Sequence, residues 1–218
     1  LNAAYLALDV TAQALPALGA LGLAGANVTI PHKEAALAAA QTIDPLAARI
    51  GATNTLKIED NRAICAWNTD APGFLAALRA GAPDWRTDRP AVVLGAGGAA
   101  RAIVVALCDA GVSDIRIVNR TRDRAEAVAA LSPAGRVCAL EEALPGAGLI
   151  VNCTAQGLKG ENPLTLDLMQ TDPNSVLFDT VYAPLDTALL ASARAQRRTA
   201  VDGLGMLVWQ AALAFEIW

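Results

Sequence analysis

Short hydrophobic runs alternate along the chain with stretches whose hydrophobic residues follow helical spacing. The runs Ala91–Leu94, Leu149–Asn152 and Val176–Asp179 are almost entirely hydrophobic, as expected for strands buried on both faces of a parallel sheet. Further strands are predicted at Tyr5–Val10, Ala26–Thr29, Asn54–Ile58, Ala63–Trp67 and Asp114–Asn119. Helices are predicted at Ala12–Gly22, from Pro31 onward, and at Pro72–Ala80, Gly98–Ala110, Arg122–Leu131, Thr187–Ala195 and Gly203–Trp218. This alternation predicts an α/β fold.

A polar segment interrupts the pattern between residues 81 and 90. Gly and Pro punctuate Gly81–Pro90, which makes this segment the best candidate for a linker. A chain of 218 residues can form one large domain or two small ones, each with a buried core. The segment therefore favours two α/β units over one.

A glycine-rich loop follows the hydrophobic run Ala91–Leu94 and opens the next predicted helix. The pattern Gly95-x-Gly97-x-x-Ala100 in this strand–turn–helix context matches the dinucleotide fingerprint. Glycines let the backbone approach a pyrophosphate, which then lies on the free N–H groups of the helix. The predicted cofactor-binding residues are Gly95, Ala96, Gly97, Gly98 and Ala99. Arg101, one turn into the helix, is expected to add positive charge there.

The end of the second strand after this loop indicates which dinucleotide is bound. NAD-binding domains usually carry an Asp or Glu there, whereas this chain has Asn119, Arg120 and Thr121, with Arg122 and Arg124 following. Guanidinium groups suit a 2′-phosphate. A solvated basic helix start is the alternative, but cations are unfavourable at helix N-termini. The pattern predicts NADP rather than NAD.

Two polar motifs precede the glycine-rich loop and supply candidate catalytic residues. Lys33 closes the motif Asn27–Lys33, and Asp70 closes Asn68-Thr69-Asp70. A lysine and a carboxylate beside a dinucleotide fold suggest proton transfer coupled to hydride transfer. Lys33 could instead be a surface lysine, and Asp70 could be only a helix N-cap. No chemistry is assigned to His32.

Three other polar residues are candidates for contacts with a polyhydroxylated ligand. Thr29 and Asn54 lie at the ends of predicted strands and offer a hydroxyl and an amide. Gln210 stands in an otherwise apolar C-terminal stretch, where it is equally a satisfied core group or a ligand contact.

Composition excludes several other classes of protein. A net charge of −4 gives no general attraction to nucleic acid or anionic membranes, and no apolar run is long enough to span a bilayer. The four cysteines are widely spaced, and one histidine without a ligand cluster makes a metal site unexpected. We therefore expect a cytoplasmic protein with reduced cysteines. The chain begins at Leu1 without a methionine and is interpreted as part of a longer protein.

Taken together, these motifs resemble the shikimate dehydrogenase family, which includes shikimate/quinate dehydrogenases. The resemblance runs in order over nearly the whole chain. It is carried by Gly25–Lys33, Gly51–Leu56, Asn68–Asp70, Gly95–Ala99, Asn119–Thr121, Asp179–Tyr182 and Asp202–Leu207. The family's N-terminal Ser-x-Ser segment, which grips the substrate carboxylate, has no counterpart here.

The resemblance implies NADPH-dependent reduction of 3-dehydroshikimate to shikimate in the chorismate pathway of aromatic amino-acid biosynthesis. It implies Lys33 and Asp70 as the catalytic pair. Substrate contacts are implied for Thr29, Asn54, Asp70, Tyr182 and Gln210. Cofactor contacts are implied for residues 95–99, Asn119, Arg120, Thr121, Arg124, Thr180 and Gly203. The implied domains are 1–70 with 203–218 for substrate, and 71–202 as a Rossmann-like NADP-binding domain, in a monomer or homodimer.

Three alternatives remain open at this point. A quinate/shikimate or aminoshikimate dehydrogenase would differ in the substituent on the ring. Another NADP reductase, such as a relative of methylene-tetrahydrofolate dehydrogenase, would share the nucleotide domain but not the Asn-Val-Thr and Asn-Thr-Asp motifs. A catalytically impaired NADP-binding module would bind the nucleotide without turnover.

Overall fold

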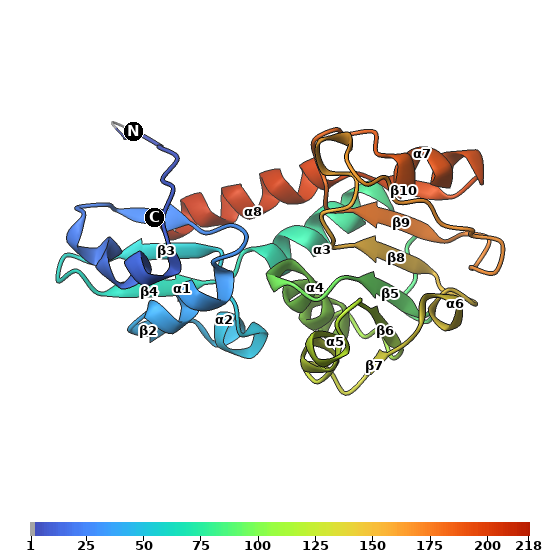
Figure 1. The fold of residues 1–218 in the computed structure, drawn as a ribbon, viewed down its shortest axis with the longest axis horizontal. Helices are drawn as coiled ribbons and strands as arrows, with labels where there is room; N and C mark the ends of the chain where they lie inside the picture. Colours follow the sequence, from blue (N-terminus) through green and yellow to red (C-terminus); the bar gives the residue numbers. More distant parts are fainter. Residues whose placement is uncertain (1–2) are drawn as a thin grey trace.

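The computed structural model describes residues 3–218, which form two lobes that each contain one sheet (Figure 1). The smaller lobe has a four-stranded sheet of order β1-β3-β4-β2, in which β4 pairs with β2 in parallel and the other neighbouring strands pair antiparallel. Its elements are the 3-10 helix η1 (Ala12–Ala20), β1 (Gly25–Asn27), α1 (Lys33–Ala39), β2 (Thr42–Ile43), α2 (Pro45–Ile50), β3 (Thr55–Ile58) and β4 (Ile64–Trp67).

The larger lobe has a six-stranded parallel sheet of order β10-β9-β8-β5-β6-β7. Its elements are α3 (Asp70–Gly81), β5 (Ala91–Leu94), α4 (Gly98–Asp109), β6 (Ile115–Val118), α5 (Arg122–Ala129), β7 (Gly135–Val137), α6 (Leu140–Ala143), β8 (Leu149–Asn152), η2 (Leu158–Gly160), β9 (Val176–Asp179), α7 (Ala188–Ala195) and β10 (Thr199–Val201). The last helix, α8, spans Gly203–Ile217.

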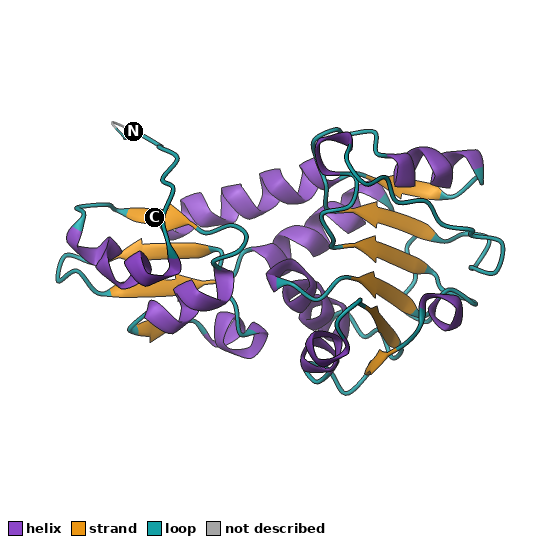
Figure 2. Ribbon diagram, in the orientation of Figure 1, coloured by secondary structure: helices purple, strands orange, loops and turns teal. Residues whose placement is uncertain are grey.

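Helices cover both faces of the six-stranded sheet, which explains why its central strands are hydrophobic at nearly every position (Figure 2). In β5, Val93 packs in a core with Phe74 of α3 and Ile103 of α4, while Val92 faces the opposite core with Leu189 of α7. The sheet is therefore the middle layer of an α/β/α sandwich, as the sequence predicts.

The carboxyl ends of the parallel strands face the smaller lobe (Figure 1). The chain adds β6 and β7 on one side of β5, then returns to add β8, β9 and β10 on the other. The connections thus diverge between β5 and β8, and ligands of open α/β sheets bind at such a switch point. The turn after β5 is the glycine-rich loop.

Two long helices join the lobes. α3 and α8 lie side by side (Figure 1), and they pack closely where Gly73 approaches Gln210. The Phe74 ring of α3 contacts Phe178 of β9 edge to face, with centroids 4.9 Å apart. At the far end of α8, the Trp218 indole donates a hydrogen bond to the Leu56 carbonyl of β3 (2.8 Å). The C-terminal helix therefore returns to the smaller lobe.

Several sequence predictions need correction. Tyr5–Val10 is not a strand: no neighbouring strand pairs with it, and Tyr5 and Leu6 are 70% and 73% exposed. The helix expected from Pro31 begins at Lys33, because the Thr29 carbonyl accepts a hydrogen bond from the His32 N–H and closes a turn first. Gly81–Pro90 joins α3 to β5, which pack in the same core, so this segment is not a linker between the lobes.

The other predicted strands and helices are present, most within two residues of their predicted ends. The short elements β2, α2, β7, α6, η2 and β10 have no counterpart in the predictions. Within residues 3–218, no helix combines the length and apolar character needed to cross a bilayer.

Candidate active site

The side chains of Lys33 and Asp70 meet between the two lobes. Lys33 is the first residue of α1, and Asp70 is the first residue of α3. Lys33 Nζ lies 2.5 Å from Asp70 Oδ2, and the two side chains are only 13% and 6% exposed. A nearly buried ion pair is shielded from solvent, so both the ammonium and the carboxylate keep a defined position. Lys33 is therefore not a surface lysine.

Asp70 is free to face Lys33 because a different residue caps its helix. Asn68 Oδ1 accepts hydrogen bonds from the Asp70 N–H (3.0 Å) and the Ala71 N–H (3.3 Å). Those are the N–H groups that a capping side chain satisfies at a helix start. The interpretation of Asp70 as an N-cap is therefore wrong.

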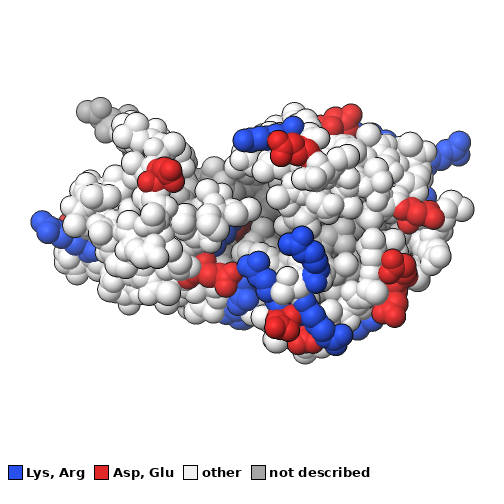
Figure 3. Space-filling model, in the orientation of Figure 1, with Lys and Arg blue, Asp and Glu red and all other residues white. Residues whose placement is uncertain are grey.

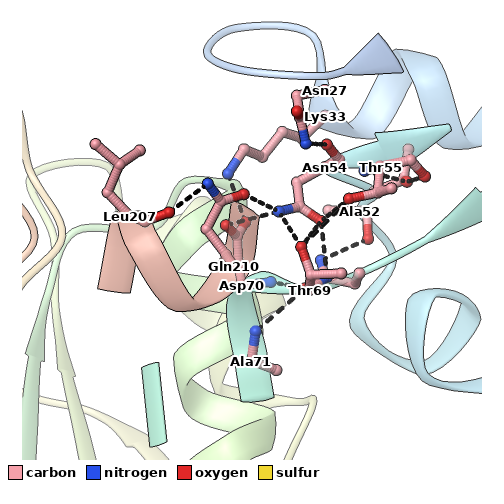
Figure 4. A network of polar contacts seen from close by, with 12 residues as sticks. Asn27, Lys33, Ala52, Asn54, Thr55, Thr69, Asp70, Ala71, Leu207 and Gln210 are labelled. Atoms are coloured by element: carbon pink, nitrogen blue, oxygen red, sulfur yellow. Dashed lines mark hydrogen bonds and ion pairs between the residues drawn. The ribbon is translucent and has the colours of Figure 1, made fainter. Parts of the chain in front are cut away.

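A buried amide holds the carboxylate from its other side (Figure 4). Asn54 Nδ2 lies 3.1 Å from Asp70 Oδ1, 2.8 Å from Thr69 Oγ1 and 3.0 Å from Gln210 Oε1. Asn54 Oδ1 accepts a hydrogen bond from the Thr69 N–H (2.7 Å). Asn54 is 2% exposed. Asn54, just before β3, therefore forms one network with the start of α3 and with Gln210 of α8.

The glycine-rich loop lies directly beside Lys33. Gly95 has φ +106°, in the region that favours glycine, and its Cα faces the Cys153 carbonyl of the neighbouring strand end. A Cβ at Gly97 would meet no protein atom within 4 Å, so space lies open above the loop. A Cβ at Gly98 would lie 3.0 Å from Lys33 Cδ. The loop comprises Gly95, Ala96, Gly97, Gly98 and Ala99.

Arg101 does not point to the loop as the sequence interpretation expects. Its Nε donates a hydrogen bond to the Ile50 carbonyl at the end of α2 (2.7 Å). A cation there satisfies a free helix carbonyl and complements the negative end of the helix dipole. Arg101 therefore links α4 to α2 of the smaller lobe.

A hollow of about 710 Å³ opens at the carboxyl ends of β5, β6 and β8. Arg120 and Arg124 line it, both are exposed, and within residues 3–218 neither forms an ion pair. Arg122, by contrast, pairs with Glu126 (2.7 Å). Figure 3 shows Lys and Arg side chains gathered on this face around α5, next to the recess that separates the two lobes. The hollow is also lined by Gly95, Asn119 and Thr121.

The remaining predicted residues form no hydrogen bond with Lys33, Asp70, Asn54 or Gln210 in the part of the chain that the structure describes. Thr29 is exposed in the turn before α1, and Tyr182 is 46% exposed in the loop after β9. Thr180 Oγ1 donates to the Asn152 carbonyl (2.8 Å). Gly203 starts α8 so close to Thr180 that a Cβ would lie 2.4 Å from the Thr180 carbonyl oxygen.

Asp179 organises the loops after β8 and β9. Its carboxylate accepts hydrogen bonds from Asn152 Nδ2 (2.9 Å), the Val181 N–H (3.0 Å) and Thr187 Oγ1 (2.7 Å). Complete burial raises the pKa of Asp179 above its ordinary value, and these three donors offset the rise only in part. No sequence pattern indicated that Asp179 organises these loops or that Asn68 caps α3, since both roles depend on contacts made after folding.

Three family models match the chain in order. The shikimate dehydrogenase substrate-binding domain matches residues 1–56, the shikimate/quinate 5-dehydrogenase model residues 80–159, and the shikimate 5′-dehydrogenase C-terminal domain residues 203–218. Among curated proteins, shikimate dehydrogenase (NADP⁺) of Methylobacterium radiotolerans is 50% identical over 98% of this chain and 80% of its own length. The enzyme of the same name from Paramagnetospirillum magneticum is 48% identical over 100% of this chain and 82% of its own.

Solved structures agree with these matches. Shikimate 5-dehydrogenase of Thermus thermophilus, in complex with NADP(H) and shikimate, has TM-score 0.83 and 40% identity, with 98% of this chain and 79% of that one covered. Quinate dehydrogenase of Corynebacterium glutamicum, in complex with NAD, has TM-score 0.84 and 30% identity, with 95% and 76% covered. The resemblance and the two-lobed α/β fold are confirmed: this chain belongs to the shikimate dehydrogenase family.

Proposed function

We propose that this chain catalyses the reversible NADPH-dependent reduction of 3-dehydroshikimate to shikimate, within chorismate and aromatic amino-acid biosynthesis. The observation that carries the proposal is the Lys33–Asp70 pair, held almost out of solvent beside Gly98, the first residue of α4. The pair combines a proton donor and a hydrogen-bonding carboxylate at the place where the two lobes meet. Curated relatives named shikimate dehydrogenase (NADP⁺) support the same activity.

The residues of the larger lobe fit NADP. Open space above Gly97 suits a pyrophosphate, which would lie on the free N–H groups at the start of α4. The exposed, unpaired guanidinium groups of Arg120 and Arg124 suit the 2′-phosphate. The proposed cofactor contacts are Gly95, Ala96, Gly97, Gly98, Ala99, Asn119, Arg120, Thr121, Arg124, Thr180 and Gly203. When bound, NADPH supplies the hydride for the ring ketone.

The residues of the smaller lobe and α8 would hold the substrate. Asp70, Asn54 and Gln210 already share hydrogen bonds, and ring hydroxyl groups would join this network. Thr29 and Tyr182 are exposed and would offer two more hydroxyl groups. Together these groups would orient the ketone before the reaction.

Lys33 would complete the reduction by giving its proton to the carbonyl oxygen, which becomes the new hydroxyl group. Asp70 would keep the ammonium in place and accept a hydrogen bond from the adjacent ring hydroxyl. A positioned proton donor of this kind contributes about 10²–10⁴-fold to the rate. In the reverse direction, Lys33 would take the proton back from shikimate.

These assignments divide the chain into a substrate domain and a cofactor domain. We propose that residues 1–70 and 203–218 form the substrate domain and that 71–202 form the Rossmann-like NADP-binding domain. The separate sheets and the return of α8 to β3 support this division. We also infer a cytoplasmic enzyme that is a monomer or a homodimer, and light scattering on the purified protein distinguishes these two states.

A spectrophotometric assay tests the activity. The protein is incubated with NADP⁺ and either shikimate or quinate, and formation of NADPH is followed. We expect turnover with shikimate and little with quinate. Faster turnover with quinate would assign the chain to the quinate branch, which the likeness to a quinate dehydrogenase makes the second candidate. NADPH binding without turnover of either acid would identify a nucleotide-binding module that has lost catalysis.

A further inference from the structure

The third glycine of the loop has a different neighbour from the other two. A Cβ at Gly98 would lie 3.0 Å from Lys33 Cδ, 3.1 Å from Lys33 Cβ and 3.5 Å from Lys33 Cγ. The stem of the lysine therefore lies across the bare Cα of Gly98, where α4 begins. This contact crosses from one lobe to the other.

Neither backbone conformation nor helix stability explains a glycine at this position. Gly98 is not among the glycines with positive φ, so an alanine would fit its backbone. Gly98 is the first residue of α4, and helices have no intrinsic preference for glycine over alanine. The neighbouring residues Ala96, Ala99 and Ala100 are all alanines. What the glycine provides is space for the lysine stem.

The lysine has little freedom to yield that space. Its backbone is fixed, because the Lys33 carbonyl accepts a hydrogen bond from the Thr53 N–H (3.0 Å). Its other end is held by Asp70, 2.5 Å from Nζ. A methyl group at residue 98 would press on both Cβ and Cδ, so the ammonium would have to leave its position by a few tenths of an ångström or more.

We propose that Gly98 is a positioning residue for the proton donor: by lacking a side chain, it lets Lys33 lie across the cofactor loop and reach Asp70. This inference rests on the proposed role of Lys33 in the reaction. It gives the three glycines separate tasks. Gly95 allows a positive φ, Gly97 leaves room for the cofactor, and Gly98 leaves room for the lysine.

Gly98→Ala tests this role through separate measurements of binding and turnover. We expect kcat for shikimate to fall about tenfold or more, since small misplacements of catalytic groups are costly. The Kd of NADPH should rise less than it does for Gly97→Ala, because Gly98 would contact the cofactor through its backbone N–H, which an alanine keeps. Gly97→Ala should instead raise the Kd of NADPH about tenfold, because its methyl group would enter the cofactor's space. A rise in Kd for Gly98→Ala that equals the rise for Gly97→Ala would overturn the proposal, and so would an unchanged kcat.

Introducing Gly98→Ala into a Lys33→Gly variant distinguishes displacement of the lysine from damage to the loop. Lys33→Gly removes all three lysine atoms that face residue 98, so Gly98→Ala should then cause no further loss of the residual kcat. A further loss in that background would show that the methyl group damages the loop itself, which contradicts the proposal. If Gly98→Ala alone does not fold, the double variant should fold, since the clash is gone. Failure of both to fold would also overturn it.

A crystal structure of Gly98→Ala gives a readout that does not depend on activity. The Lys33 Nζ to Asp70 Oδ2 distance should increase, and an unchanged distance would refute the positioning role. If Lys33→Gly retains normal turnover, the proposed function of Lys33 is wrong. The distance from Lys33 Nζ to Asp70 Oδ2 in Gly98→Ala still shows whether Gly98 positions the lysine.

Discussion

Lys33 and Asp70 are the first residues of two different helices, separated by 37 positions in the sequence, and their side chains lie 2.5 Å apart. The ammonium and the carboxylate stabilise each other, because an unpaired charge that is nearly buried would be strongly disfavoured. Asn68 caps the helix of Asp70, and Asn54 holds its second oxygen. The protein's own side chains therefore fix the positions of Lys33 and Asp70.

Arg120 should matter more for NADPH than for NADH. Arg120→Ala removes an exposed guanidinium proposed to bind the 2′-phosphate, and charge-assisted contacts of this kind are worth about 1.5–3 kcal/mol, or roughly 10–100-fold in affinity. Titration with each nucleotide measures the effect. Arg122→Ala is the matched control, because Arg122 already pairs with Glu126. Equal losses for both nucleotides would refute the assignment to the 2′-phosphate.

Asn54 should stabilise the fold as well as the site. Asn54→Ala would leave the buried Thr69 N–H and Asp70 Oδ1 without a partner, at a cost of about 1–3 kcal/mol in the free energy of unfolding. Denaturation in urea measures this change. The exposed Asn174 offers a control, for which alanine should change stability by less than about 0.5 kcal/mol. Equal stability of the two variants would contradict the role given to the Asn54 network.

Asp179 should make stability depend on pH. Its pKa is higher in the folded than in the unfolded chain, so its favourable contribution is largest at low pH and is lost as the pH rises through the folded value. Asp179→Asn removes the charge and keeps an acceptor for Asn152 and the Val181 N–H. Relative to the wild type, this variant should therefore gain stability with increasing pH.

Urea unfolding at acidic, neutral and mildly alkaline pH measures the difference between Asp179→Asn and the wild type. The exposed Asp84 serves as the control, since Asp84→Asn should give a nearly constant difference across the same range. A difference for Asp179→Asn that stays flat or shrinks toward alkaline pH would show that the buried carboxylate is not disfavoured.

Sequence reasoning succeeded where the pattern itself carries the structural cause. The strands β5, β8 and β9 have the predicted ends because a run buried on both faces is hydrophobic throughout. The strands β7 and β10 were missed, since three residues at or near a sheet edge show no periodicity. Tyr5–Val10 was predicted wrongly because a hydrophobic run forms a strand only beside a partner strand.

The candidate site divides in the same way. Residue types and motif context were enough to single out Lys33, Asp70 and Gln210, which the fold brings into contact or into one network. The Asn68 cap and the contact of Gly98 with Lys33 depend on how the lobes meet, which no local pattern encodes. Arg101 was misassigned because its partner, the Ile50 carbonyl, is also distant in sequence.

The most direct test of the central claim is the turnover of Lys33→Ala with saturating NADP⁺ and shikimate. Loss of the proton-transferring group should lower kcat about 10²–10⁴-fold, with little change in the Kd of shikimate. Lys57→Ala, which removes a more exposed lysine paired with Glu59 in the same lobe, should leave kcat near the wild-type value. Near-normal turnover by Lys33→Ala would contradict the account.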